Sequence, residues 1–153
     1  MRTGRPKQPL TLTEEERERK KIQPKDVEHW KRQMLVMHVF DSLVYNTDRN
    51  LGNILLDENG KIWMIDHTRA FRRQTDLRNP KMLVQCERHL WEKLRTLDEA
   101  LVKARLKPFL HDYEIDPLLK RHRKLVEHFQ GQIAQQGEAQ VLFTLWEEKQ
   151  KPQ

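Results

Sequence analysis

The sequence lacks several features on which whole classes of protein depend. Its single cysteine, Cys86, excludes an intramolecular disulfide and a metal site built from several cysteines, so we expect a reducing compartment. No stretch approaches the roughly 18 apolar residues of a membrane-spanning helix, and the N-terminus has no apolar run of the signal-peptide kind. We therefore expect a soluble, cytoplasmic protein with no membrane span.

Charge is what the sequence has in quantity. Of its 153 residues, 34% are charged and 37% are hydrophobic, which allows one domain with a core but not two. The formal net charge is +6, and residues 1–33 hold 10 Lys and Arg against 6 Asp and Glu. A basic surface attracts nucleotides, nucleic acid, anionic lipid or acidic protein, and charge alone does not choose among them.

The first 25 residues differ in composition from the rest. They contain three prolines and few large apolar side chains, which indicates a basic flexible arm. Thr13 and Glu16 have the spacing of a capping box and predict a short helix within it. Residues 2–7, RTGRPK, resemble the minor-groove core of an AT-hook. The predicted divisions are an arm (1–25), one domain (26–147) and a tail (148–153).

Residues 27–45 carry the clearest periodic pattern. Apolar side chains recur there at steps of three and four, as one face of an amphipathic helix requires. They are Val27, Trp30, Met34, Met37, Phe40 and Val44. Residues 46–52 are rich in Asn and Asp, whose side chains bond the local backbone, so a loop should follow this helix.

Two short runs with a preference for β-structure follow the loop. NILL and KIWMI flank Asn59-Gly60, a strong hairpin turn signal. A hairpin returns its far end to its starting point, so Asp66 should lie beside Asn53, with Asp48 nearby on the loop. Two interpretations are open: these residues cap and turn the chain, or they hold a metal ion over a reacting phosphate.

Phosphoryl transfer needs such a set of side chains. Hard oxygen ligands hold Mg²⁺ on the nucleotide phosphates, and a separate carboxylate orients the attacking hydroxyl. Kinases supply an Asp on a catalytic loop, an Asn five residues later and a second Asp after a hairpin. The order Asp48, Asn53, hairpin, Asp66 matches that arrangement in residue type and spacing.

The stretch TDRNLGNILLDENGKIWMID resembles the catalytic loop and metal-binding segment of the phosphatidylinositol 3- and 4-kinase-like group of the protein-kinase fold. The resemblance implies that Asp48 and Arg49 are catalytic. It implies that Asn50, Asn53 and Asp66 bind the ATP cofactor, with Asn53 and Asp66 as ligands of Mg²⁺ or Mn²⁺. Asn50 stands where the group usually has His. Asp-His-Thr replaces the group's Asp-Phe-Gly or Asp-Asn-Gly, so the usual conformation after Asp66 is in question.

A larger departure lies before the loop. A kinase has an N-terminal lobe of roughly 80 or more residues, with a glycine-rich loop and a strand lysine that hold the phosphates. Only one glycine and no V-A-I-K strand precede Asp48. The resemblance therefore implies a C-terminal lobe with the N-lobe missing. Three explanations are open: a relic or fragment, a second chain that supplies the N-lobe, or a minimal site.

The rest of the sequence predicts helices. Residues 82–97 are amphipathic, and Asp116-Pro117 has the cap and first-turn proline of a long helix. Residues 120–124, KRHRK, should form a basic face on that helix, and residues 141–146 a last core segment. We expect an α+β, mainly helical fold: a protein-kinase-like C-terminal lobe with one small β-hairpin.

The leading functional prediction is an ATP- and Mg²⁺-dependent phosphotransferase, or a truncated remnant of one, acting on a protein, lipid or small-molecule hydroxyl. The alternative is a non-catalytic, basic nucleic-acid-binding module that grips DNA or RNA with residues 2–7 and 120–124. Asp48, Asn53 and Asp66 discriminate between them. Clustered acids repel a polyanion unless a metal intervenes, so a nucleic-acid binder gains nothing from them.

Overall fold

The computed structural model describes residues 11–146, and the structural statements below concern these residues. The AT-hook-like residues 2–7 and the predicted tail 148–153 lie outside them. Within the described range, helices predominate and the sheets are small, as the mainly helical α+β prediction requires. No helix in this range is both long enough and apolar enough to cross a membrane.

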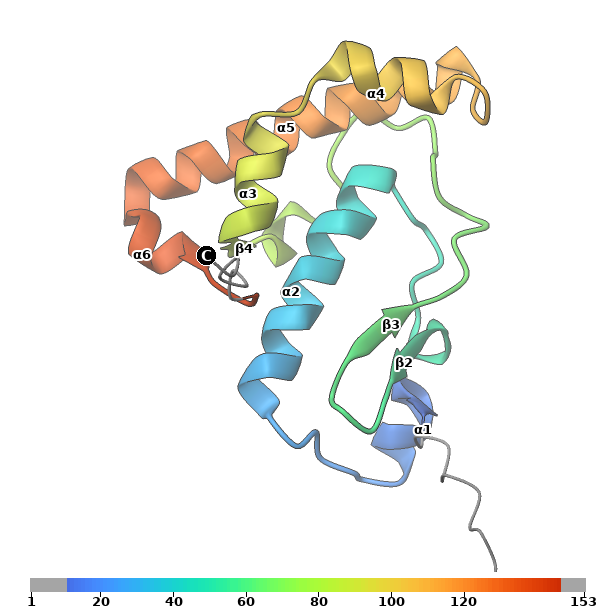
Figure 1. Cartoon of the computed structure of the whole chain (residues 1–153), viewed down its shortest axis with the longest axis vertical. Helices are drawn as coiled ribbons and strands as arrows, with labels where there is room; N and C mark the ends of the chain where they lie inside the picture. The colour runs from blue at the N-terminus through green and yellow to red at the C-terminus, as the bar shows by residue number, and fades with distance from the viewer. Residues whose placement is uncertain (1–10, 147–153) are drawn as a thin grey trace, which may run out of the picture.

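A three-stranded antiparallel sheet lies at one end of the molecule (Figure 1). The predicted hairpin is confirmed: β2 (Ile54–Leu56) pairs with β3 (Ile62–Met64), with Leu56 opposite Ile62. Gly60 makes the turn with a φ of +80°, a conformation that glycine adopts without a Cβ clash. The prediction of a single hairpin missed a third strand, β1 (Leu12–Thr13), which pairs with the outer edge of β2.

The segment that follows β1 is packed into the fold. Thr13 caps α1 (Glu14–Arg19) by accepting a hydrogen bond from the Glu16 N–H, so the predicted helix start is confirmed. The prediction of a flexible arm is wrong for β1 and α1. Glu14 is fully buried and Arg17 nearly so, because the two side chains satisfy each other at 2.8 Å.

The predicted amphipathic helix is α2 (Val27–Val44), which runs between the sheet and the other helices (Figure 1). Asp26 caps its start, and Tyr45 ends it in the left-handed conformation, with a φ of 50°. The helix contacts β3 on one side and α5 on another. The loop that follows the C-terminal end of α2 therefore lies between the sheet and the other helices.

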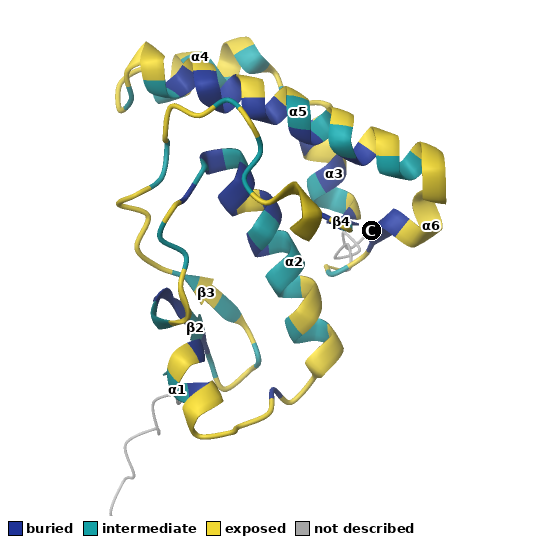
Figure 2. Cartoon of the chain, turned by 180° about the vertical axis from the view of Figure 1, so that it is seen from behind, coloured by how far each residue is buried: buried dark blue, intermediate teal, exposed yellow. Residues whose placement is uncertain are grey.

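The helical layer forms the main core. In Figure 2 the side of α5 that faces α2 and α3 is buried and its other side is exposed. The core cluster joins Val39 of α2 to Trp91, Leu125 and Phe129. Its elements are η2 (Pro80–Met82), β4 (Cys86–Glu87), α3 (Arg88–Arg95), α4 (Glu99–Leu106), α5 (Asp112–Gln136), α6 (Glu138–Val141) and β5 (Leu142–Phe143).

Two predicted helix starts are wrong. The pattern over residues 82–97 predicted one helix, but β4 pairs in parallel with β5 and takes Cys86 and Glu87 out of it. The long helix α5 starts at Asp112, five residues before the predicted first-turn proline. His111 and Glu114 form a capping box there, so Pro117 lies inside the helix. The last core segment is confirmed at its start, because Val141 and β5 are buried.

The predicted basic face of residues 120–124 is wrong for Arg121 and His122. Arg121 is fully buried and donates to backbone carbonyls, and His122 is buried beside it. Arg123 pairs with Glu99 at 2.6 Å, and the Lys124 ammonium pairs with Asp76. Apart from the exposed Lys120, the side chains that would have bound a polyanion therefore pack inside or have acidic partners.

Candidate functional site

The loop between α2 and β2 is held by its own side chains. Asn46 is buried, and its Oδ1 accepts a hydrogen bond from the Asp48 N–H at 3.0 Å. Asn50 caps a short 3₁₀ helix, η1 (Leu51–Asn53), by accepting from the Gly52 N–H at 2.9 Å. A turn of 3₁₀ helix thus ends the stretch predicted as a loop. Polar side chains that bond nearby backbone groups, as Asn does readily, are the reason.

Gly52 lets α1 approach this loop. A Cβ placed on Gly52 would lie 3.1 Å from Asn50 Oδ1 and 3.3 Å from Glu15 Oε2, which is tighter than ordinary contacts. The N-terminal segment therefore packs directly on the turn that positions the candidate site. No feature of the sequence near Gly52 identified this contact.

Asn53 joins the two ends of the loop. Its Nδ2 donates to the Asp48 carbonyl, and its Oδ1 accepts from the Asn50 N–H at 3.1 Å. The same Oδ1 also accepts from Arg49 Nη1 at 3.2 Å. Asn53 is 6% exposed. Its amide group therefore fixes the backbone that presents Asp48, which is half-buried with its Oδ1 3.3 Å from Asn50 Nδ2.

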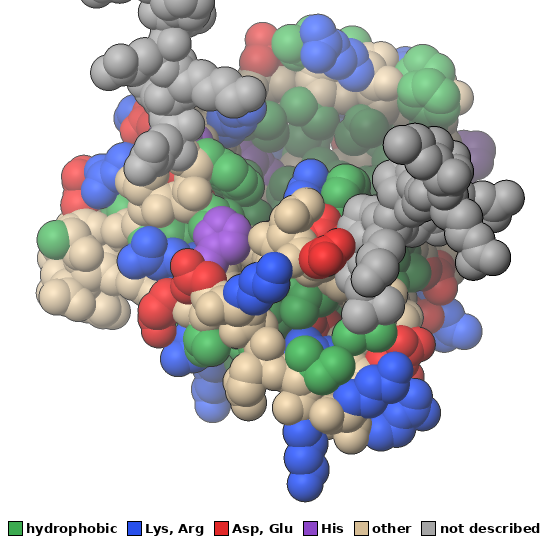
Figure 3. All heavy atoms as spheres, turned by 60° about the horizontal axis from the view of Figure 1, so that its bottom comes forward, with side chains coloured by type: hydrophobic (Ala, Val, Ile, Leu, Met, Phe, Trp, Pro, Cys, Tyr) green, Lys and Arg blue, Asp and Glu red, His purple; other side chains and the backbone are tan. Residues whose placement is uncertain are grey.

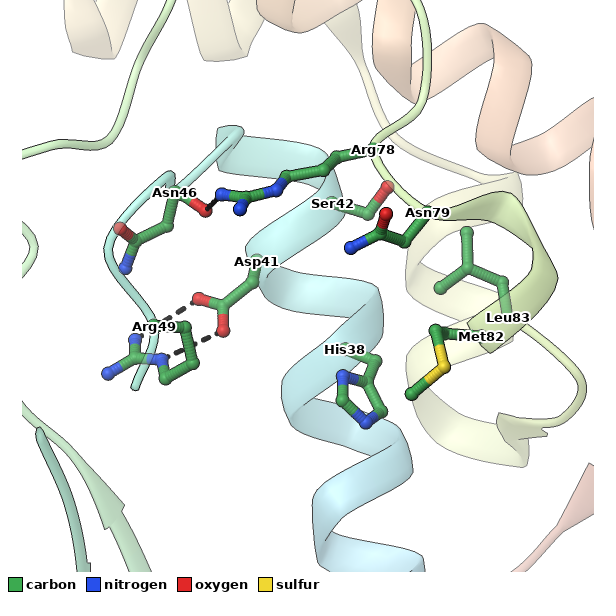
Figure 4. A pocket seen from close by; sticks show the side chains of 9 residues that line it. All are labelled: His38, Asp41, Ser42, Asn46, Arg49, Arg78, Asn79, Met82 and Leu83. Carbon is green, nitrogen blue, oxygen red and sulfur yellow. Dashed lines mark hydrogen bonds and ion pairs between the residues drawn. The ribbon is translucent and has the colours of Figure 1, made fainter. Parts of the chain in front are cut away.

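Arg49 connects three elements. Its Nε and Nη2 donate to the two carboxylate oxygens of Asp41 at 2.8 and 3.1 Å, and Figure 4 shows this pair at the edge of α2. Its Nη1 donates to the carbonyls of Asn53 at 3.0 Å and Ile65 at 2.8 Å. Its side chain is 9% exposed. One side chain therefore links α2, the loop and the end of the hairpin.

Asp66 follows β3 and lies beside Asn53, as the hairpin predicts. The pairing of the strands continues past β3, because the Ile65 N–H donates to the Asn53 carbonyl at 3.1 Å. Asp66 has a φ of +60°, which is uncommon outside glycine, although Asp tolerates it better than most residues do. Strained backbone of this kind clusters at functional sites.

Hydrogen bonds hold Asp66 in its ionised form. Its Oδ1 accepts from Thr68 Oγ1 at 2.7 Å and from the Thr68 N–H at 3.3 Å. These bonds, with smaller contributions from His67 and Arg49, lower the pKa of Asp66 below its ordinary value. The carboxylate is exposed, so a hard, charged oxygen ligand faces solvent at the end of the hairpin.

The segment after Asp66 folds back onto the start of the loop. The N–H and the Oγ1 of Thr47 both donate to the Arg69 carbonyl at 3.2 Å, and the Phe71 N–H donates to the Val44 carbonyl at 2.6 Å. Arg69 and Arg72 are exposed there. Their guanidinium groups are therefore available on the surface next to the loop that carries Asp48.

A polar cavity of about 130 Å³ lies behind the loop, between α2 and η2. Figure 4 shows Asp41 and His38 of α2 on one side and Asn79 and Met82 on the other. Arg78 crosses above it to donate to the Asn46 carbonyl. The sequence placed Asn46 in the loop but gave no indication of Asp41 or Arg78. An Asn two residues before Asp48 was a usable Asx-turn signal for Asn46, whereas Asp41 and Arg78 carried none.

Asp66 and Asn53 differ in the acceptor atoms that they leave open for a divalent ion. In the described part of the chain, no group of three or more His, Cys, Asp or Glu is placed to hold a metal. Asp66 offers a carboxylate whose Oδ2 has no hydrogen bond among the described residues. The Oδ1 of Asn53 already accepts two hydrogen bonds from protein donors.

A carboxylate on an ordered loop, a hairpin and a second exposed carboxylate beside it are the features expected of a kinase-like phosphotransferase. Comparison with known proteins agrees. The family model described as phosphatidylinositol 3- and 4-kinase matches residues 12–112, well over half of the chain, and the chain belongs to this family. The match begins at β1 and includes Asp48, Asn53 and Asp66. A search of curated proteins finds no match.

Proposed function

We propose that this chain carries the catalytic residues of an ATP- and Mg²⁺-dependent phosphotransferase that acts on a hydroxyl group of a protein, a lipid or a small molecule. The main observation in support is that Asn53 forms two hydrogen bonds, one to the loop that carries Asp48 and one to the end of the hairpin. Its side chain binds the Asp48 carbonyl, and its backbone carbonyl binds the Ile65 N–H next to Asp66. Membership of the phosphatidylinositol 3- and 4-kinase family supports the reaction class.

Asp48 is the residue assigned to orient the acceptor hydroxyl. Its backbone is fixed from both sides by Asn46 and Asn53, whereas its side chain hydrogen-bonds only to the exposed Asn50 among the described residues. A fixed backbone with an accessible carboxylate suits a group that must meet a proton in one geometry. Asp66 would hold the metal ion, which neutralises charge on the nucleotide phosphates when bound.

The exposed arginines after Asp66 favour an acceptor or nucleotide with phosphate groups. Arg69 and Arg72 lie next to the Asp48 loop, and Arg72 donates to the Arg69 carbonyl at 3.3 Å through its Nε. The terminal nitrogens of the Arg72 guanidinium form no hydrogen bond among the described residues. A guanidinium group with open donors meets phosphate oxygens in bidentate geometry.

A second chain that supplies the N-lobe is part of the proposal. Leu51, Trp63 and Ile65 are exposed on the hairpin and the turn before it, next to Asp48 and Asp66. A patch of large apolar side chains on a surface marks an interaction site, and we propose that these three side chains take part in one. We place the complex in the cytoplasm, where the free thiol of Cys86 would stay reduced.

The alternative of a nucleic-acid-binding module has less support. Figure 3 shows Lys, Arg, Asp and Glu side chains interspersed on the uncovered part of the face near the sheet, instead of a surface of one sign. Residues 120–124 are buried or have acidic partners, apart from Lys120. The binding of a polyanion needs several free cations arranged on one surface.

The test is phosphate transfer from labelled ATP to protein, lipid and small-molecule acceptors, with and without a chain that carries a glycine-rich loop. Asp48→Asn should keep nucleotide affinity within a few-fold of wild type and lower turnover by roughly 10²-fold or more, because a positioned base is lost. Glu58→Gln, an exposed change in the hairpin turn, is the matched control and should transfer like wild type. Equal transfer by Asp48→Asn and wild type would refute the catalytic role of Asp48.

A second readout separates the two functional classes. The nucleic-acid-binding alternative replaces the proposal if no preparation transfers phosphate while the chain binds DNA tightly. The logarithm of the DNA-binding constant should then fall by several units for each tenfold increase in salt concentration. DNA binding that is weak in wild type leaves the transfer result to decide.

A further inference from the structure

Asn53 has no free acceptor for a metal ion. A side-chain amide oxygen has two lone pairs. In Asn53 one accepts from the Asn50 N–H at 3.1 Å and the other from Arg49 Nη1 at 3.2 Å. The side chain is also buried, and its Nδ2 is bound to the Asp48 carbonyl. The amide group is therefore committed on all sides to holding the loop.

The partner of Asn53 is itself a cation. A guanidinium group is a cation, so Arg49 places a positive charge against the amide oxygen. A divalent cation on that oxygen would lie beside a like charge in partly buried surroundings, where repulsion is weakly screened. The charge of Arg49 thus occupies the position that an ion bound by Asn53 would need.

Arg49 cannot swing aside without loss elsewhere. Both oxygens of the buried Asp41 carboxylate depend on it, at 2.8 and 3.1 Å, and so do the carbonyls of Asn53 and Ile65. Removing the cation would leave Asp41 as a buried charge without its partner, which is strongly unfavourable. Asp66 differs in each respect, because it is exposed and its Oδ2 has no hydrogen bond among the described residues.

We propose that this site binds a single divalent ion, on Asp66, and that the Arg49 guanidinium stands in the place of a second ion at Asn53. Asn53 is then a positioning residue for Asp48 and for the strand that ends at Asp66. The inference rests on the proposed function, because it concerns the metal that a nucleotide brings to the site. It departs from the metal-ligand role that the sequence resemblance implied for Asn53.

The test counts Mn²⁺ ions bound to the full chain in the presence of a non-hydrolysable ATP analogue, by equilibrium dialysis and electron paramagnetic resonance. Wild type should bind one Mn²⁺ per nucleotide complex. Asp66→Asn should weaken that ion at least about tenfold, because an amide is a poorer ligand for a hard dication. Asn53→Asp keeps both acceptors for Arg49 and Asn50 but loses the Nδ2 donor to the Asp48 carbonyl, so it should still bind one Mn²⁺, and no more tightly than wild type does.

A double variant gives the opposite result. Asp41→Asn with Arg49→Gln replaces the ion pair by two neutral amides and frees an oxygen of Asn53, so the complex should take up a second Mn²⁺. Circular dichroism spectra and unfolding midpoints establish that each variant is folded. Two ions on wild type, or much tighter binding by Asn53→Asp, would overturn the inference and leave the proposed function standing. No Mn²⁺ or nucleotide binding by wild type, even with a glycine-rich-loop partner, would overturn both.

Discussion

The Nε of Arg121 on α5 donates a hydrogen bond to the Leu43 carbonyl on α2, at 2.9 Å. The Nη1 of the same guanidinium donates to the carbonyls of Arg72 and Gln74, at 2.9 and 2.5 Å. One buried side chain therefore ties the helix before the candidate catalytic loop to the segment after Asp66. Burial lowers the pKa of Arg121 to about 10, with Tyr45 acting in the opposite direction, and Arg121 stays protonated at neutral pH.

Replacing Arg121 should destabilise the whole domain. Arg121→Met removes the donors to three backbone carbonyls, and we expect the free energy of unfolding to fall by about 3 kcal/mol. Urea unfolding followed by circular dichroism measures it. The control is Lys120→Met, an exposed neighbour for which a change within about 0.5 kcal/mol is expected. Similar values for the two variants would show that the carbonyl contacts contribute little.

The side chain of Glu14 links α1 to α2 and so to the rest of the domain. Its carboxylate accepts from Arg17 Nε at 2.9 Å, from Arg17 Nη2 at 2.8 Å and from Trp30 Nε1 at 3.2 Å. Glu14→Ala would leave the Arg17 guanidinium buried without its partner and should lower the free energy of unfolding by about 3 kcal/mol. Glu18→Ala, exposed on the same helix, is the control. A segment that behaves as a flexible arm would give no difference between the two variants in urea unfolding.

Local signals in the sequence were sufficient for the elements that depend on neighbouring residues. Asn59-Gly60 specified the hairpin because a tight turn is set by the two residues that form it. The spacing of apolar residues specified that residues 27–44 form a helix. It was less accurate for the buried face, because Val27 and Phe40 are exposed and Val39, outside the predicted face, lies in the core. The loop and the hairpin then placed Asp48, Asn53 and Asp66 in one region, since a hairpin returns the chain to its start.

Local signals of this kind could not predict pairings between residues that are far apart in the sequence. β1 contributes only two residues to the sheet, and the residue types of Leu12–Thr13 do not indicate that this strand pairs with β2. Buried charges were missed for a related reason. Composition assigns Glu14, Asp41 and Arg121 to the surface, because charged residues are buried only when a specific partner exists, and the partner is known only from the fold.

The thiol of Cys86 should report unfolding. It is 1% exposed, and burial, assisted by the charge of Glu87, raises its pKa to about 12. At pH 8 only about one thiol in 10⁴ would be the reactive thiolate even if reagent could reach it. We expect no reaction with Ellman's reagent in buffer and one equivalent per chain in urea. Reaction in buffer at the rate of a free thiol would contradict the packing of β4 against β5.

Thr68 should control the acidity of Asp66 and thereby the pH range of metal binding. Because its Oγ1 hydrogen bond favours the ionised carboxylate, Thr68→Val should raise the pKa of Asp66 toward its ordinary value, while the bond from the residue 68 N–H remains. A group with a lowered pKa stays charged to lower pH, so wild type should lose Mn²⁺ on acidification at a lower pH than the variant does. Carbon-detected NMR titration of the Asp66 carboxyl gives the two pKa values directly, and the other carboxyl signals are internal controls. An unchanged Asp66 pKa, with the Mn²⁺ curves of both proteins superimposed, would mean that Thr68 does not hold the carboxylate in solution.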